Sequence, residues 1–330
     1  MSRWALGVSL ALLLAVAMLL GVLFGSVPVG ASELWAVLLG GGDPTNRDII
    51  LHLRLPRVLL AGLVGGGLAM AGATLQALLR NPLAEPYILG MSRGASVGAV
   101  LVLSLGLATA GSWVMPLAAF VGAVGAIALV FRVATSAGRG MDVRVLLLAG
   151  VVVAAFFSAC IAFILSISSA RTVQSAVFWI MGSLAAADWG DVVTAALYTL
   201  PAGILLMALA RPLNLMAIGD ETAHYLGADV EGVKRAALGV AALITAAAVA
   251  VAGVIGFVGL VVPHAVRLAV GSDHRALLPL SFLGGAAFLT LADLVARVAL
   301  APAEIPVGVI TAFVGVPLFL VLLRRSLGAR

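Results

Sequence analysis

Charged residues are scarce in this chain of 330 residues, where Asp, Glu, Lys and Arg together make up 10%. Soluble globular domains average about 25% charged residues. Hydrophobic residues account for 63% of the chain, and the mean hydropathy is +1.22. The 19 cationic residues are scattered and form no dense basic stripe, which excludes a nucleic-acid partner. The composition therefore predicts a protein whose main solvent is lipid.

Cysteine and catalytic motifs are also nearly absent. Cys160 is the only cysteine, so the chain has no internal disulfide and no cysteine-cluster metal site. No G-x-x-x-x-G-K-[ST] loop, Ser/His/Asp set, paired histidine ligands or H-E-x-x-H motif occurs. His264 follows Pro263 in a glycine-rich stretch, and a lone histidine there is typical of a structural role. The chain is thus expected to be non-catalytic, with no metal site and no cofactor of its own.

Apolar runs of about 20 residues, the length of a bilayer-crossing helix, recur along the whole chain. A helix satisfies its backbone hydrogen bonds internally in lipid, so we predict an all-α polytopic membrane protein of about ten spans. The first run has no clear small-x-small cleavage site and is read as a span rather than a signal peptide. The segment Val173–Trp189 is expected to lie at a membrane surface. The predicted spans are 5–26, 57–79, 88–108, 112–132, 144–166, 191–210, 236–254, 255–270, 277–297 and 306–323.

The distribution of cationic residues orients the chain. With a cytoplasmic N-terminus, 14 of the 19 lie on the cytoplasmic side and five outside, as the positive-inside rule requires. Both termini are then cytoplasmic. Small residues at helical spacing, such as Gly94 with Gly98 and Gly122 with Ala126, are expected to let helices pack closely.

One cytoplasmic stretch is unusually polar. Between Arg211 and Arg235 the chain contains Gly219-Asp220-Glu221-Thr222-Ala223 and then Leu226-Gly227. Asp220 can cap a helix N-terminus and Gly227 can end that helix. A short capped helix with exposed acids suits docking against another protein, although an ordinary loop helix is the alternative.

The ordered motifs of the chain resemble those of the iron-siderophore, haem and cobalamin permeases of ABC importers (FecCD-type, BtuC-like). The likeness runs from about residue 25 to 323. Its motifs are Leu53-Arg54-Leu55-Pro56-Arg57, Gly72 with Gln76, Arg80-Asn81-Pro82-Leu83-Ala84-Glu85-Pro86, Leu89-Gly90, Trp179-x-x-Gly182-Ser183, the polar stretch above, Gly256-Phe257-Val258-Gly259-Leu260 with Pro263-His264 and Arg267, Asp293 with Arg297, Glu304-Ile305-Pro306-Val307-Gly308, and Gly315-x-Pro317.

This resemblance implies a single permease domain, 1–330, with a coupling segment at about 214–232. It implies a homodimer around one central pathway in a bacterial or archaeal cytoplasmic (inner) membrane. Two ATP-binding cassette subunits would bind the cytoplasmic face and hydrolyse the ATP. A periplasmic or extracellular binding protein would deliver the substrate.

The resemblance also assigns roles to individual residues. Docking of the binding protein falls to Arg54, Arg57 and Arg297, although arginines at helix ends can instead snorkel to lipid headgroups. The cytoplasmic gate falls to Asn81, Leu83, Met141 and Asp142, although Pro82 and Pro86 could merely shape a turn. Contact with the ATPase falls to Asp220, Glu221, Thr222 and Leu226.

Asp293 and Arg297 are four residues apart and share a helical face. This spacing predicts a local ion pair, with a proton relay as the alternative. A proton-coupled secondary transporter that uses Asp293 or Glu304 is therefore the alternative function, while an intramembrane enzyme would lack a catalytic set. Haem, ferric siderophore and cobalamin all remain open as substrates, with a slight preference for an iron complex.

Overall fold

The computed structural model describes residues 2–25, 27, 29–108, 113–136, 142–225, 227 and 229–328, which are almost entirely helical. Extended pairing among them is limited to an isolated bridge between Leu300 and Ala303. The elements in chain order are α1 (Arg3–Leu23), α2 (Ala31–Leu38), α3 (Pro44–Asp48), the π-helix η1 (Ile49–Arg54), α4 (Leu55–Leu78), the 3-10 helix η2 (Pro86–Leu89), α5 (Met91–Ser104), α6 (Val114–Ser136), α7 (Val143–Ser166), α8 (Ala170–Ile180), α9 (Trp189–Ala208), α10 (Ala210–Ile218), α11 (Asp220–Tyr225), α12 (Val230–Ala252), α13 (Val258–Val270), α14 (His274–Val298) and α15 (Val307–Gly328).

Helices long and apolar enough to cross a membrane confirm the predicted fold class. In the described ranges seven qualify: α1, the continuous run from α3 to α4, α6, α7, α9, α12 and α14. Three shorter apolar helices, α5, α13 and most of α15, occupy the remaining predicted spans. The amphipathic α8 is only 11 residues long, in keeping with a piece that does not cross.

Two spans are shorter than predicted because irregular backbone precedes them. Helix α5 has 14 residues and α13 has 13, whereas about 20 residues are needed to cross the hydrocarbon core. The irregular segments are 79–90 before α5 and 253–257 before α13, where the sequence predicted a glycine-marked turn. Non-helical backbone at membrane depth is tolerated only inside protein. Accordingly, Leu89 is fully buried and Ile255 is 1% exposed.

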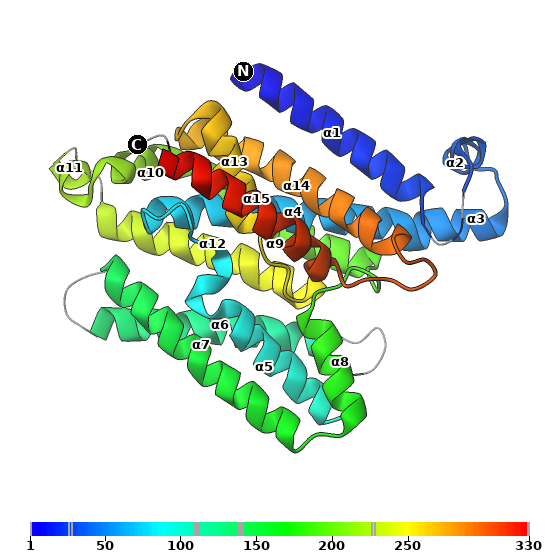
Figure 1. The fold of residues 1–330 in the computed structure, drawn as a ribbon, viewed down its shortest axis with the longest axis horizontal. Helices are drawn as coiled ribbons and strands as arrows, with labels where there is room; N and C mark the ends of the chain where they lie inside the picture. Colours follow the sequence, from blue (N-terminus) through cyan, green and yellow to red (C-terminus); the bar gives the residue numbers. More distant parts are fainter. Residues whose placement is uncertain are drawn as a thin grey trace.

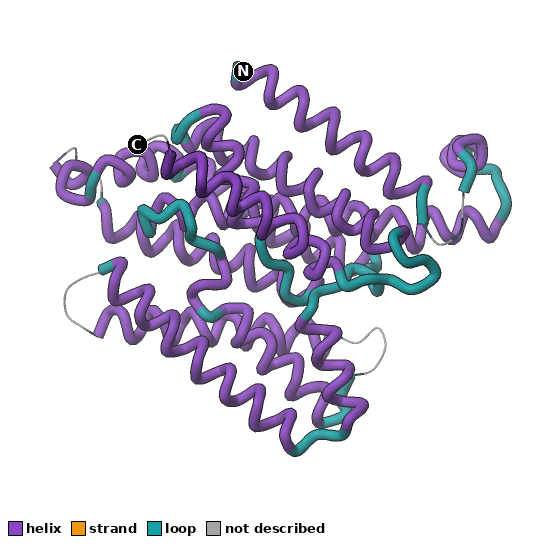
Figure 2. The backbone as a smooth tube through the Cα atoms, viewed as in Figure 1, coloured by secondary structure: helices purple, strands orange, loops and turns teal. Residues whose placement is uncertain are grey.

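The helices form two groups joined by α12 (Figure 1). In the larger group α4 is central and packs against α9, α12, α13 and α14, while α1 lies along α14. Helices α5, α6 and α7 form the smaller group, with α8 beside α5. Figure 2 shows that the helices in both groups run in roughly the same direction and that loops gather at their ends.

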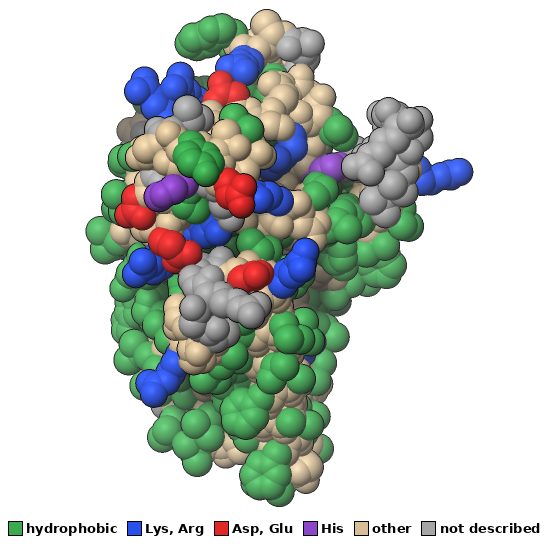
Figure 3. All heavy atoms as spheres, turned by 90° about the vertical axis from the view of Figure 1, so that its left-hand side faces the viewer, with side chains coloured by type: hydrophobic (Ala, Val, Ile, Leu, Met, Phe, Trp, Pro, Cys, Tyr) green, Lys and Arg blue, Asp and Glu red, His purple; other side chains and the backbone are tan. Residues whose placement is uncertain are grey.

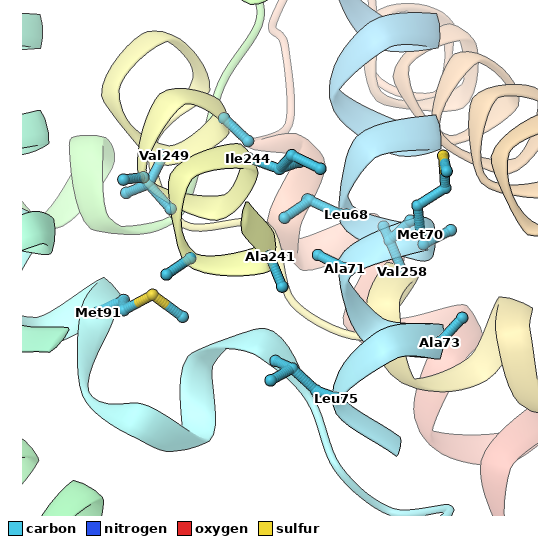
Figure 4. Packing of buried hydrophobic residues seen from close by; sticks show 14 of the residues in the cluster. Leu68, Met70, Ala71, Ala73, Leu75, Met91, Ala241, Ile244, Val249 and Val258 are labelled. Carbon is cyan, nitrogen blue, oxygen red and sulfur yellow. The ribbon is translucent and has the colours of Figure 1, made fainter. Parts of the chain in front are cut away.

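The core between these helices is built largely from small side chains. A Cβ added at Gly65 on α4 would lie 2.3 Å from the carbonyl oxygen of Gly285 on α14, and one at Gly94 would lie 2.3 Å from that of Gly122. These close backbone approaches confirm the packing role predicted for the small residues. Figure 4 shows Leu68 of α4 beside Ile244 of α12, and Ala71 of α4 near Val258 at the start of α13.

One end of the molecule carries a cluster of charged side chains. Charged side chains gather on the end that carries α11, whereas hydrophobic side chains cover the surface beside it (Figure 3). Both chain ends lie on this same side (Figure 1). Together with the distribution of arginines, this places α10 and α11 on the cytoplasmic side and α2, α3 and η1 on the outer side.

Candidate functional site

Arg57 lies at the outer end of α4 between two carboxylates. Its Nε and Nη2 donate to Asp293 Oδ1 at 3.0 and 2.9 Å, and its Nη1 donates to Glu304 Oε2 at 2.9 Å. Asp293 belongs to α14, and Glu304 lies in the loop before α15. A guanidinium group presents a planar fork of donors that suits such paired contacts. Arg57 therefore joins α4 to α14 and to the loop that leads into α15.

Two further arginines hold the outer end of α1. Arg297 donates from Nη2 to the Gly21 carbonyl at 3.0 Å, and its Nε lies 3.1 Å from Asp293 Oδ2, an ion pair without a well-directed hydrogen bond. Arg54 donates from Nη1 to the carbonyls of Val22 and Leu23 at 2.8 and 2.7 Å. The last carbonyls of a helix lack intrahelical partners and form the negative end of its dipole. The two guanidinium groups satisfy them.

The three arginines predicted to dock the binding protein are thus turned inward. Arg54, Arg57 and Arg297 are 5%, 8% and 4% exposed, so none reaches the surface as a snorkelling arginine would. The predicted local ion pair of Asp293 with Arg297 is confirmed. The side chain of Glu304 is 36% exposed and is the most accessible charged member of the network. Docking by these arginines stays a prediction.

Irregular segment 79–90 contains the predicted gate residues Asn81 and Leu83. Asn81 Oδ1 accepts the backbone N–H of Leu83 at 2.9 Å, which closes a tight turn, and Leu83 is 41% exposed. Asp142 caps α7 by accepting the backbone N–H of Arg144 at 2.7 Å. Met141 lies outside the described residues. The turn predicted as the alternative is therefore present, and the exposed Leu83 side chain leaves the gate role open.

A polar joint ties segment 79–90 to the break before α13. Glu85 Oε1 accepts the backbone N–H of Phe257 at 2.6 Å, and Tyr87 Oη accepts that of Ile255 at 3.2 Å. Gln76 Nε2 donates to the carbonyl of Leu260 at 3.1 Å. These contacts satisfy backbone groups that the helix breaks leave open. Sequence reasoning missed the joint, because Glu85 and Gln76 stood out only as members of motifs.

The coupling segment forms a separate helix, as predicted. Helix α11 begins at Asp220 and ends at Tyr225, and Gly227 follows with a φ of 83°. Glu221 and Thr222 are exposed, Ala223 is buried, and Tyr225 is 87% exposed. The side chain of Asp220 is not described, and Leu226 lies outside the described residues.

A cytoplasmic cavity of about 770 Å³ brings several predicted residues together. Asp142 at the start of α7 and Glu221 of α11 both line it. Leu79 and Arg80, which immediately precede the predicted gate residues, line it too. The predicted coupling segment, the start of α7 and the segment with the predicted gate residues therefore meet at one cavity.

The Asp293 network generates a prediction about stability. Asp293→Ala leaves two buried guanidinium groups without their shared carboxylate, and breaking a buried ion pair in this way costs about 3–5 kcal/mol. We expect a loss of that size in the free energy of unfolding, measured by denaturant titration in mixed micelles. The control is Asp48→Ala, since the Asp48 side chain is 78% exposed and 4.0 Å from His52. An equal loss in both variants would contradict the role given to Asp293.

The Glu85 joint generates a prediction about stability. Glu85→Ala leaves the backbone N–H of Phe257 without its acceptor. A buried donor left unsatisfied costs about 1–3 kcal/mol, so we expect a loss of that size in the free energy of unfolding, measured by denaturant titration in mixed micelles. Glu85→Gln keeps an oxygen for Phe257 and is the matched control. Equal losses in the two variants would refute the role of this hydrogen bond.

Comparison with known proteins agrees with this arrangement. The model of the FecCD transport family matches residues 13–325. The cobalamin import system permease protein BtuC of Halobacterium salinarum is 46% identical over 306 residues, which cover 92% of this chain and 81% of that protein. The hemin transport system permease protein HmuU of Yersinia pestis is 42% identical over 329 residues, which cover 98% of this chain and 96% of that protein.

Solved structures share the fold of this chain. An inward-facing metal-chelate type ABC transporter superposes with a TM-score of 0.87 at 33% identity, over 97% of this chain and 98% of that chain. PsaBC from Streptococcus pneumoniae, solved with a Fab, shares the fold at 16% identity and a TM-score of 0.56, over 81% of this chain and 90% of that chain. The chain is therefore a multi-span protein of the bacterial inner membrane that belongs to the FecCD transport family, and it is the permease of a metal-chelate, cobalamin or haem type ABC importer.

Proposed function

We propose that two copies of this chain enclose a pathway for a large preassembled metal chelate: haem, a ferric siderophore or cobalamin. Two ATP-hydrolysing subunits drive the cycle from the cytoplasm, and a binding protein delivers the chelate from outside. The chain itself holds no cofactor in this proposal. The observation that carries it is the exposed helix α11 at the charged end of an otherwise apolar helical body.

Helix α11 suits a cleft in the ATPase subunit. Tyrosine is enriched among the residues that contribute most to protein interfaces, and Tyr225 is 87% exposed at the cytoplasmic end. Glu221 and Thr222 beside it supply polar contacts, and Ala223 anchors the helix in the body of the permease. Asp220 and Leu226 complete the proposed contact set. The exposed face of α11 would then stay bound to the ATPase subunit and move with it as the ATPase pair closes and opens.

The proposed pathway wall is apolar. A cavity of about 570 Å³ lies between the end of α8, Val254 and α15, and it is lined by Ile180, Met181, Val254, Gly308, Val309, Ala312, Phe313, Val316 and Pro317. On α15, Phe313 is 75% exposed. Such a wall offers few fixed polar groups to hold a chelate tightly. This supports passage of a bulky substrate, with selection left to the binding protein and the wall completed by the second copy.

The cytoplasmic gate would be formed by Asn81 and Leu83 with Met141 and Asp142. Two observations support this proposal. Leu83 is exposed, and Asp142 lines the same cavity as Glu221. A ligand-driven switch needs an element that has two states and binds its partner differently in each. ATP binding by the ATPase subunits that contact α11 would bias the gate between them.

The binding protein would dock over the outer ends of α4 and α14. Arg54, Arg57 and Arg297 lie there, and carboxylates of a partner could compete for their guanidinium groups. Because Asp293 holds two of the three from inside, such docking would partly open the network. Glu304, which is the most accessible member, would exchange first.

Co-purification with the ATPase from a neighbouring reading frame tests the proposal. We expect ATP-dependent uptake into proteoliposomes of hemin, a ferric siderophore or cyanocobalamin, each presented on its binding protein. Glu221→Arg combined with Tyr225→Ser should weaken ATPase binding about tenfold or more, since such interface residues each contribute above about 1 kcal/mol.

Trp4→Ser is the matched control, because Trp4 is an equally exposed aromatic residue at the same end, 85% exposed and outside the coupling segment. Uptake driven by a proton gradient without any ATPase would overturn the proposal.

A further inference from the structure

The side chain of Asn214 links the proposed coupling segment to α14 by hydrogen bonds. Asn214 lies on α10, six residues before α11 begins. Its Nδ2 donates to Asp273 Oδ1 at 2.8 Å, and its Oδ1 accepts the backbone N–H of His274 at 2.9 Å. Oδ1 also lies 2.7 Å from Nδ1 of His274. Both polar atoms of this amide therefore bond to residues at the start of α14.

The amide orientation follows from the donors around it. The backbone N–H of His274 can only donate, so the atom that faces it must be the amide oxygen. His274 Nδ1 must then carry a hydrogen, and Asp273 must receive the amide N–H. Asp273 is also the N-cap of α14, because it accepts the backbone N–H of Arg275 at 3.1 Å. The hydrogen bond from Asn214 is the largest cause that holds the pKa of Asp273 below its usual value.

The same carboxylate reaches α1. Arg3 Nη1 donates to Asp273 Oδ2 at 2.9 Å. At the opposite end of these helices, Arg297 of α14 donates to the Gly21 carbonyl of α1 at 3.0 Å. Helices α1 and α14 are thus fastened together at both ends of the membrane.

Helix α14 is also locked to α4 along its length. Gly285 and Gly65 bring the two backbones together so closely that an added Cβ on either would meet the other's carbonyl oxygen at 2.3 Å. Arg57 and Asp293 join the same two helices at the outer end. Close-packed helices in contact of this kind move as one body rather than deforming. A displacement at the first turn of α14 therefore reaches its outer end.

We propose that Asn214 is the positioning residue through which movement of the coupling segment reaches α14 and, through Asp293 and Arg297, the outer face of the permease. The inference rests on the proposed function, because it assigns the route of a motion that the ATPase drives. A second polar contact, from Arg80 Nε to the carbonyl of Met216 at 3.3 Å, leads from α10 to the gate segment instead. These two polar contacts lead from α10 in different directions, one to the proposed gate segment and the other to α14.

The test uses the full permease with its ATPase and binding protein in proteoliposomes. Asn214→Ala removes the link and should reduce the chelate imported per ATP hydrolysed by about 5- to 100-fold, the usual range of coupling between sites. Basal ATP hydrolysis and ATPase co-purification should stay at the parental level, because α11 is untouched. The matched control on the same helix is Ala217→Ser, at an exposed position.

A conservative pair of variants separates coupling from mere folding. Asn214→Asp replaces the amide donor by a second carboxylate opposite Asp273 and should uncouple transport. Asp273→Asn keeps an oxygen that can accept from both Asn214 and the backbone N–H of Arg275, because one atom, Oδ1, accepts both in the parent, and asparagine still caps α14 well. Asp273→Asn should therefore keep most of the parental import per ATP.

Each outcome separates this inference from the proposed function. Absence of ATP-driven import of hemin, ferric siderophore and cyanocobalamin by the parent chain would refute the proposed function itself. Import by the parent together with an unchanged import per ATP in Asn214→Ala would overturn only the role of Asn214. An equal loss of coupling in Asp273→Asn and Asn214→Asp, with both variants as stable as the parent, would also overturn it.

Discussion

The Asp293 carboxylate lies between the guanidinium groups of Arg57 and Arg297 in a part of the molecule that water barely reaches. An isolated charge there would be strongly disfavoured, so each of the three groups depends on the others. Because Arg57 is on α4 and Arg297 holds the carbonyls at the end of α1, the network decides how three helices meet. The outer end of the permease is organised around this one carboxylate.

Buried polar groups need partners from the protein at the two helix breaks as well. Lipid offers no hydrogen bonds, so the backbone groups of segments 79–90 and 253–257 need partners from the protein. Glu85 and Tyr87 supply partners for the N–H groups of Phe257 and Ile255, and Gln76 bonds to the Leu260 carbonyl in the first turn of α13. These contacts join the segment that contains the proposed gate to the start of α13. Phe257, which begins α13 with a φ of 69°, packs closely against Gly315 of α15. The gate segment is thereby connected to a helix that lines the proposed pathway.

Features that depend on the local sequence could be predicted. Runs of apolar residues gave the ten spans, and the break between α12 and α13 falls where glycines cluster. The polar stretch around Asp220 and Gly227 correctly predicted a short separate helix. The direction in which Arg54, Arg57 and Arg297 point could not be predicted, because hydropathy places a charge near a membrane surface without identifying its neighbours.

Contacts between distant segments could not be predicted either, because the sequence pattern does not identify a residue's neighbours in space. Glu85 meets a backbone N–H 172 residues away, and Asn214 meets a helix start 60 residues away. The residues next to each of them in sequence are typical of an ordinary loop or surface position and give no sign of such a contact. The shortness of α5 and α13 was missed because the residues just before these helices, Ile88 and Leu89 before α5 and Val254 and Ile255 before α13, are apolar.

We expect α1, α4 and α14 to move as one rigid body. Pulsed EPR distances between α1 and α14 in lipid test this claim. Spin labels at Leu19→Cys on α1 and Val295→Cys on α14, both at exposed positions, would be placed in a Cys160→Ser background. Each labelled chain is diluted with unlabelled chain, and the complex is compared with and without ATP and vanadate. A second pair, Leu19→Cys with Phe163→Cys on α7, reports whether the complex has moved. We expect the distance between α1 and α14 to stay the same while the α1–α7 distance shifts. A shift or broadening between α1 and α14 would show that these helices do not move as one body.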